Sequence, residues 1–145
     1  MSFVSECTDN FKEIVTQKYC LFSGRARRRE FWEYQLAVWV ISIILTLIER
    51  ALHLQIVSGI ATVGILSGIA GLALLLPGLG VTVRRLHDID KDWYWIFIVC
   101  IPFIGSIWLL VLECMEGNRF DNRFGPDPKA ERLLDTDPGD LPGSL

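Results

Sequence analysis

The sequence predicts an all-α membrane protein with three transmembrane helical segments, an N-terminal amphipathic interfacial helix and a disordered tail. The strongest evidence is residues 54–83, because none of these thirty side chains is ionisable. A bilayer requires such a run, since about 20 apolar residues at ~1.5 Å rise span its hydrocarbon core, whereas the helices of a soluble domain present a polar face to water. Two further blocks are similar: residues 31–48, in which Glu33 is the one charged residue, and residues 93–112, which carry no charge.

Residues 1–24 are predicted to form an amphipathic helix that lies at the membrane surface. Apolar residues recur there at roughly helical spacing with charged residues between them, so the helix is too polar to cross a bilayer. Ser23-Gly24 ends this segment, and a membrane domain over residues 25–128 follows. The apolar positions of the helix are Phe3, Cys7, Phe11, Ile14, Val15 and Phe22.

The first transmembrane segment is expected near residues 31–52. A cationic run precedes it and leads directly into a tryptophan. Arginine at headgroup level and tryptophan at the interface are typical of the end of a membrane helix, and each basic residue near the surface contributes about 1 kcal/mol of attraction to anionic lipid. Contacts with anionic headgroups, and control of topology, are therefore expected from Arg25, Arg27, Arg28, Arg29 and Trp32.

The second segment, expected near residues 56–83, has a stripe of small residues. They recur at steps of three, four and three positions, and two of them form a Gly-xxx-Gly motif. Small residues on one stripe let two helix backbones approach closely and gain dispersion contacts that lipid cannot replace. The stripe predicts packing against another segment or against a second copy of the chain, through Ala61, Gly64, Gly68 and Gly71.

The third segment, expected near residues 93–114, contains Pro102 close to its midpoint. A proline there is compatible with a kink or a re-entrant turn. We expect one kinked crossing, because the twenty apolar residues are too few for two crossings.

Basic residues predict the orientation. Six precede the first segment, one lies in the first loop and three lie in the second loop, so the positive-inside rule places the N-terminus in the cytoplasm. Four more follow the third segment, and charge counting alone favours a cytoplasmic tail, with thirteen basic residues inside and one outside. A third crossing would instead export the tail, so its side stays open. Residues 129–145 are polar and rich in proline and glycine, which predicts disorder.

A polar cluster in the second loop carries the most chemistry. Paired His and Asp can bind metals, but such sites need further ligands, and His53 is expected across the membrane. The acidic residues at alternate positions of 88–92 resemble the start of a calcium loop, but Trp93 stands where that loop requires glycine. We expect no catalytic residue, metal or cofactor, and interpret the cluster as a local ion-pair network. Its members are Arg84, Arg85, His87 and Asp88.

Three ordered motifs resemble the signature of a known family. They are Phe22-Ser-Gly-Arg-Ala-Arg-Arg-Arg-Glu-Phe-Trp32, Arg84-Arg-Leu-His-Asp88 followed by Trp93 and Trp95, and Asn122-Arg-Phe-Gly-Pro-Asp-Pro128. Over about residues 11–129 the chain is similar to the small bacterial inner-membrane proteins catalogued as domain of unknown function 805. A doubled Asn-Arg-Phe and the acidic stretch at residues 88–92 depart from the pattern. The resemblance implies residence in the cytoplasmic membrane and brings no established activity.

These observations favour a non-enzymatic membrane module that binds lipid or partner membrane proteins and self-associates through the small-residue stripe. Anionic lipids, a second copy or another membrane protein are the expected partners, and no surface is basic enough for nucleic acid. The alternative is a small transporter or channel subunit, with the second-loop cluster at the mouth of a pathway. A pathway normally shows ionisable residues at membrane depth, and only Glu33 lies inside an apolar block.

Overall fold

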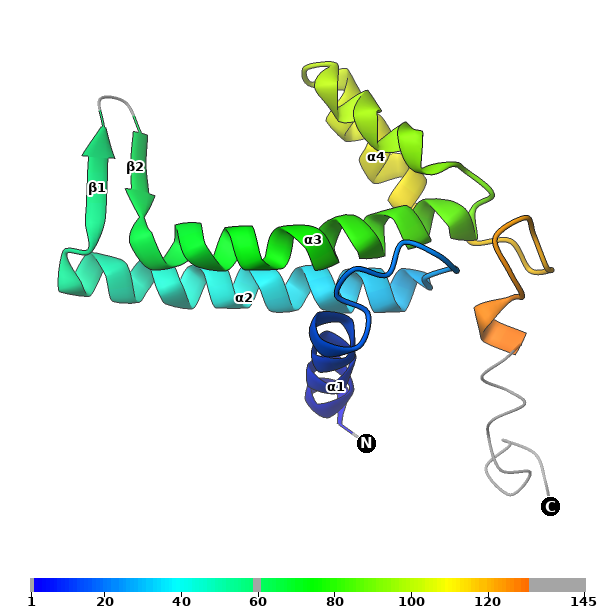
Figure 1. Ribbon diagram of the computed structural model, residues 1–145, viewed down its shortest axis with the longest axis horizontal. Coiled ribbons are helices and arrows are strands. Elements are labelled where there is room, and N and C mark those ends of the chain that lie inside the picture. The colour runs from blue at the N-terminus through cyan, green and yellow to red at the C-terminus, as the bar shows by residue number, and fades with distance from the viewer. Residues whose placement is uncertain (1, 59–60, 131–145) are drawn as a thin grey trace. The chain divides into compact units, whose positions relative to one another are not determined.

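The computed structural model describes residues 2–58 and 61–130, which are mostly helical (Figure 1). The chain divides into two compact units, residues 1–21 with 30–81, and residues 22–29 with 82 onward. The predicted disordered tail lies outside the described residues, except for its first two positions. In chain order the elements are α1 (Phe3–Thr16), α2 (Arg28–Leu52), β1 (Gln55–Ser58), β2 (Ala61–Gly64), α3 (Ile65–Asp88), the 3-10 helix η1 (Trp93–Cys100) and α4 (Ile104–Cys114).

Helix α1 packs across the start of α2 in the first unit. Ser2 caps it by accepting a hydrogen bond from the amide of Ser5. Its Asn10 side chain donates to the carbonyl of Glu30 at 3.1 Å and to the carboxylate of Glu33 at 3.0 Å. Cys7 and Ile14 on the same face are buried. The apolar stripe of this amphipathic helix is therefore partly covered by protein.

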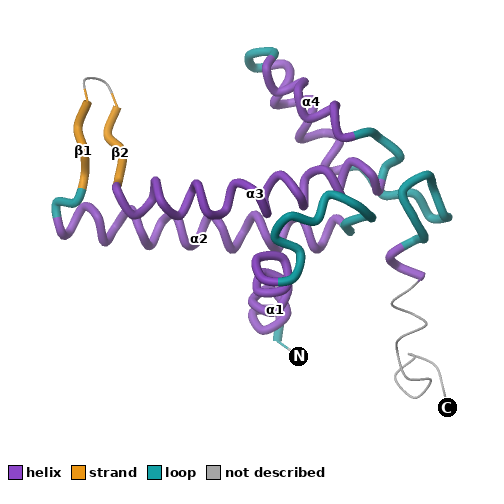
Figure 2. Tube along the Cα trace, in the orientation of Figure 1, coloured by secondary structure: helices purple, strands orange, loops and turns teal. Residues whose placement is uncertain are grey.

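Helices α2 and α3 lie side by side in the first unit, as the trace in Figure 2 also shows. Both are long and apolar enough to cross a membrane. The core helix of a soluble protein would pass the same test, but it would be mostly buried, whereas only 6% and 17% of the most apolar stretches of α2 and α3 are buried. Leu72 and Ile43, for example, are 73% and 60% exposed. This much apolar surface is compatible with a lipid environment and not with water.

Two tyrosines donate hydrogen bonds to backbone carbonyls of α3 close to Pro77. A proline lacks the amide hydrogen that would bond the carbonyl four residues earlier, which here is the carbonyl of Ala73. The Tyr19 hydroxyl donates to that oxygen at 2.7 Å. The Tyr34 hydroxyl donates to the next carbonyl, that of Leu74, at 2.9 Å. The Tyr19 side chain thus supplies the bond that proline removes, which apolar surroundings make necessary.

The predicted helix over residues 56–83 is wrong at its start. Strands β1 and β2 pair antiparallel there, with Gln55 opposite Gly64, and the helix begins only at Ile65. The predicted stripe is therefore not one helical face, because Ala61 and Gly64 belong to β2. Gly64 is still a site of close packing, since a Cβ at this position would overlap the carboxylate of Glu49. Gly71, by contrast, has open space around it.

Glu49, near the end of α2, caps the first turn of α3. Its carboxylate accepts hydrogen bonds from the Ser67 amide at 2.8 Å and from the Ser67 hydroxyl at 2.6 Å, and the side chain is buried. A carboxylate at this point satisfies an amide that has no partner within its helix and lies at the positive end of the helix dipole. Glu49 therefore ties the hairpin end of the two long helices together.

The predicted third segment is not one helix. Residues 93–114 form η1 and α4, joined by a turn in which Phe103 takes a positive φ of 62°. Gly105 makes the turn possible, because a Cβ there would overlap the carbonyl of Ile98. We call this pair of short helices the η1–α4 hairpin. The expectation of one continuous kinked helix is corrected accordingly, because Pro102 breaks the helix near its centre and Gly105 lets the two legs approach closely.

Candidate functional site

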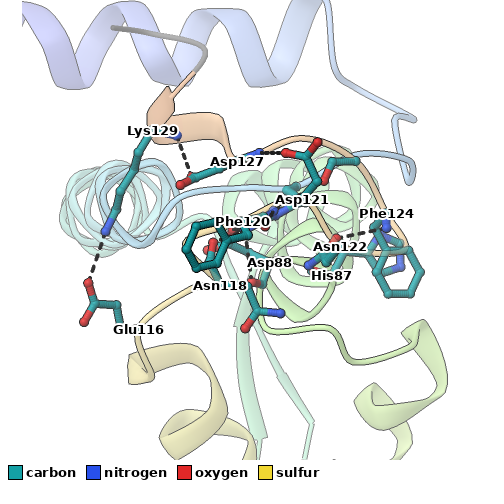
Figure 3. A network of polar contacts seen from close by, with 12 residues as sticks. His87, Asp88, Glu116, Asn118, Phe120, Asp121, Asn122, Phe124, Asp127 and Lys129 are labelled. Atoms are coloured by element: carbon teal, nitrogen blue, oxygen red, sulfur yellow. Dashed lines mark hydrogen bonds and ion pairs between the residues drawn. The ribbon is translucent and has the colours of Figure 1, made fainter.

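The three sequence motifs meet in the second unit. The segment before α2 runs along the end of α3, with the amide of Ala26 donating to the carbonyl of Arg84 at 2.9 Å. The loop that follows α4 returns to the same place, and Figure 3 shows its residues around Asp88. We call the resulting cluster the Asp88 node. Its members are Arg25, Arg85, His87, Asp88, Asn118 and Asn122.

Asp88 is the centre of the node and is 5% exposed. Its carboxylate accepts from two guanidinium groups: Arg25, with Nε at 3.0 Å and Nη2 at 2.9 Å from Oδ1, and Arg85, which bonds Oδ2. The Arg85 side chain is fully buried and that of Arg25 is 1% exposed. Charge pairing on both carboxylate oxygens is what makes the burial of these groups tolerable.

The two arginines also bind the carbonyls of the chain after α4. Arg85 donates to the carbonyls of Glu113, at 3.0 Å, and Met115, where the helix ends. Arg25 donates to the carbonyls of Phe120, at 2.8 Å, and Asn118. Arginine suits this role and lysine does not, because the guanidinium group carries five hydrogen-bond donors in a fixed planar arrangement. The guanidinium groups therefore cap a helix end and fix the following loop.

His87 holds the first and third motifs together. Its Nδ1 lies 3.1 Å from the carbonyl of Gly24, and its ring stacks on Phe124, with centroids 3.9 Å apart and planes at 3°. Its own carbonyl accepts from the side-chain amide of Asn122 at 2.8 Å. His87 of the second motif is thus joined to Gly24 of the first motif and to the Asn-Arg-Phe segment of the third.

An exposed rim of charge pairs surrounds the node. Arg123 contacts the carboxylates of Asp90 at 3.1 Å and Asp92 at 3.5 Å, and the hydrogen bond that it donates to Asp90 raises the pKa of Arg123 above its ordinary value. Lys129 lies 3.3 Å from Glu116, and this hydrogen bond lowers the pKa of the Glu116 carboxyl. Pairs this exposed contribute about 0–1 kcal/mol each, so the buried node, and not the rim, accounts for the fixed geometry.

The chemistry open to the node is limited by its packing. The carboxylate of Asp88 is taken up by arginines and by contact with Gly117, where a Cβ would overlap it. Among the described residues no group of three or more His, Cys, Asp or Glu side chains could hold a metal ion. A general acid or base must reach its substrate. The Nδ1 atom of His87 instead lies against the carbonyl of Gly24, and its ring is stacked on Phe124. The geometry is that of a structural latch.

The structure separates the arginines that the sequence grouped together. Arg25 is buried in the node, so the expectation that it binds lipid headgroups is wrong, because its guanidinium is enclosed by protein. Arg28 and Arg29 are exposed, Arg27 and Trp32 are half-buried, and Arg28 also donates to the carbonyl of Cys114 at 3.1 Å. Arg84 is buried beside the node.

Three further residues were not singled out by the sequence. Asn118 donates its amide to the carbonyl of Asp88 at 2.8 Å, and Gly117 leaves room for the Asp88 carboxylate. Only long-range contacts reveal the role of Gly117 and Asn118. The third is Glu49, which caps α3. Its position at the edge of an apolar block is the sequence feature that could have identified it, because carboxylates are rare there.

Comparison with known proteins places these motifs in a family. A family model described as "Protein of unknown function (DUF805)" matches residues 19–126. Inner membrane protein YhaH of Escherichia coli K12 is 41% identical over 117 residues, which cover 81% of this chain and 94% of that protein. Inner membrane protein YhaI of the same strain is 40% identical over 115 residues, covering 79% and 92%. No solved structure matches the chain.

Proposed function

We propose that this chain, which belongs to the DUF805 family of bacterial inner-membrane proteins, is a non-enzymatic membrane module that binds anionic lipid. The observation that carries the proposal is the division of its arginines. One set is enclosed in the Asp88 node, and another, Arg28 and Arg29, is exposed at the start of the apolar helix α2. A rigid latch that holds exposed cations next to apolar surface suits a headgroup and its acyl chains.

The start of α2 supplies both parts of such a contact. Arg28 begins the helix, and Trp32 follows one turn later, half-buried against Phe31 with ring centroids 5.3 Å apart. Guanidinium groups bind phosphate through paired hydrogen bonds, and an indole ring is stable at the level of the headgroups. Further along α2 most of the exposed side chains are apolar, as acyl chains require, and exposed polar ones such as Ser42 and Thr46 are few.

A matched pair of double variants tests the proposal. Arg28→Gln with Arg29→Gln removes two exposed charges at the proposed site, and Lys12→Gln with Arg119→Gln removes two exposed charges elsewhere. At about 1 kcal/mol per basic residue, the first pair should weaken phosphatidylglycerol binding by about 30-fold. Binding is measured as the lipid-dependent rise in melting temperature of the purified protein in an uncharged detergent.

The control variant should bind phosphatidylglycerol like the wild type, and phosphatidylcholine should stabilise all three proteins equally. Equal affinity of the wild type and the Arg28→Gln, Arg29→Gln variant would contradict the proposal. The test compares lipids on one folded protein, so general loss of stability does not imitate the expected result.

Transport is the rival function, and the polar residues within the apolar helices argue against it. Glu33 is buried and accepts from Asn10, and Glu49 is buried and accepts from Ser67. Carboxylates that line a pathway must instead face its water-filled interior. Ion or solute flux in liposomes that His87→Ala abolishes would replace the proposed function with transport.

A further inference from the structure

The η1–α4 hairpin exposes one of the most apolar surfaces of the described chain. Its tip is the most exposed part, with Phe103 at 85% and Ile104 at 71%. Both legs carry further exposed apolar side chains, among them Phe97 and Ile107 at 58% and 62%. No charged residue occurs between positions 93 and 112. Water does not solvate such a surface without a large cost, so it requires an apolar surrounding.

The length of the legs decides how far they can reach. Helix α4 has 11 residues and η1 has eight. At ~1.5 Å per residue in an α-helix and ~2.0 Å in a 3-10 helix, both legs are about 16 Å long. The hydrocarbon core is ~30 Å thick. Each leg therefore reaches about the middle of the bilayer, and neither can cross it.

Both ends of the hairpin are fixed at the same place. Side chains from its two bases, Trp95 and Ile96 on η1 and Leu109 on α4, pack on one core of Leu86, Ile89 and Leu112. The start is also held through Asp92, which contacts Arg123, and the end through Met115, whose carbonyl accepts from Arg85. Entry and exit thus lie beside the end of α3, and the tip points away from both.

Charge counting agrees with entry and exit on one side. Arg84, Arg85 and Lys91 precede the hairpin, and Arg119, Arg123 and Lys129 follow it. If the hairpin turns back, all of these face the cytoplasm, in accordance with the positive-inside rule. A full crossing would place the second set outside and would also pull Arg123 away from Asp90, to which it is bonded.

We propose that the η1–α4 hairpin is a re-entrant element embedded in the acyl chains of the cytoplasmic leaflet, and that the chain after Cys114 lies in the cytoplasm. The protein then crosses the membrane twice, through α2 and α3. Irregular backbone at the tip is tolerable because its bonds are internal: Gly105 donates to the carbonyl of Ile101 at 3.0 Å, and Ile104 to that of Pro102 at 2.7 Å. This proposal does not depend on headgroup binding by Arg28 and Arg29.

Cysteine labelling of the full chain in inner membranes tests the topology. The four native cysteines are replaced by serine, and single cysteines are introduced as His53→Cys, Phe103→Cys and Arg119→Cys. A membrane-impermeant maleimide is applied to spheroplasts and to inverted vesicles. His53→Cys should react only in spheroplasts and Arg119→Cys only in inverted vesicles. Phe103→Cys should react in neither until detergent is added.

Two results of this labelling would overturn the proposal. Reaction of Arg119→Cys in spheroplasts would mean that the chain crosses a third time. Reaction of Phe103→Cys without detergent would place the tip in water. Each variant is first compared with the parent by gel filtration and melting temperature, and Ile104→Cys replaces Phe103→Cys if the latter does not fold.

A second measurement identifies the occupant of the apolar surface. Purified Phe103→Cys protein labelled with bimane is placed in phosphatidylglycerol–phosphatidylcholine vesicles at high lipid-to-protein ratio. Spin labels near the acyl-chain ends should quench the fluorescence more strongly than spin labels on headgroups. Absence of quenching from either depth would indicate that a second copy covers the tip, and it would refute the lipid assignment. Neutral variants at Arg28 and Arg29 should leave this quenching unchanged, which separates the outcome from that of headgroup binding.

Discussion

The hydrogen bond that the Tyr19 hydroxyl donates to α3 should stabilise the fold only because Pro77 is present. Tyr19→Phe leaves the Ala73 carbonyl without the donor that it lacks within its own helix. The net value of such a bond is about 0.5–1.5 kcal/mol in proteins, and about 0.6 kcal/mol on average between membrane helices. We therefore expect Tyr19→Phe to lower the free energy of unfolding by about 1 kcal/mol.

Pro77→Ala should abolish most of this cost. An alanine at position 77 supplies an amide hydrogen to the Ala73 carbonyl, so the tyrosine becomes dispensable. The double-mutant cycle should then give a coupling energy of about 1 kcal/mol, or about fivefold in the unfolding equilibrium. Cavity effects of Pro77→Ala occur in both arms of the cycle and cancel. Unfolding is followed by fluorescence of the five tryptophans during titration of mixed micelles with sodium dodecyl sulfate.

Tyr34→Phe is the matched control for this cycle. Its hydroxyl donates to the carbonyl of Leu74, whose partner four residues on is Gly78 and not a proline. The cost of Tyr34→Phe should therefore be the same with Pro77 and with alanine at that position. Equal cost of Tyr19→Phe in the two backgrounds would refute the reasoning that this tyrosine replaces the missing amide.

Three further predictions concern the latch and the close contacts. Asp88→Asn removes the carboxylate that two buried guanidinium groups share and should cost about 3–5 kcal/mol, whereas Asp90→Asn at the exposed rim should cost less than about 1 kcal/mol. Melting temperature and abundance in membranes measure both, and equal losses would disprove the central role of Asp88. Gly64→Ala should destabilise the protein because its Cβ would overlap the Glu49 carboxylate, and Gly71→Ala should not; similar melting temperatures of the two would contradict this. Gly105→Ala should open the η1–α4 hairpin and lower the free energy of unfolding by the amount typical of overpacking, about 1–3 kcal/mol; an unchanged melting temperature would exclude the close approach to Ile98.

The sequence was sufficient to predict the helices whose position depends on local composition. The uncharged blocks located α2 within three residues of its start, because a continuous apolar stretch bounded by arginines is unambiguous. It was insufficient at residues 55–64, where the apolar run continues but the chain forms β1 and β2. β-Branched residues are concentrated there and glycine stands between them, a strand signal that hydropathy alone conceals.

The Asp88 node could be anticipated only in part. Its motifs were recognisable, and pairing of Arg85 with Asp88 follows from their spacing of three along a helix. The bond between Arg25 and Asp88 spans 63 positions, and no local pattern distinguishes Arg25 from the exposed Arg28. Only the packed loop after α4 determines which arginine is enclosed. Long-range convergence of this kind depends on tertiary structure, so a single sequence does not contain it in readable form.

The buried arginines can act at two stages, during membrane insertion and in the folded protein. During insertion the chain is unfolded, and every basic residue near a segment end contributes to orientation, whatever its later contacts. After folding, Arg25 and Arg85 are withdrawn from lipid and hold the loop that follows the η1–α4 hairpin. Substituting Arg25 by glutamine should therefore leave the orientation of α2 unchanged, because twelve of the thirteen basic residues that the proposed topology places in the cytoplasm remain. It should instead release the loop after α4. We propose that the same residue type directs topology first and fixes the fold afterwards, and that only its second role depends on Asp88.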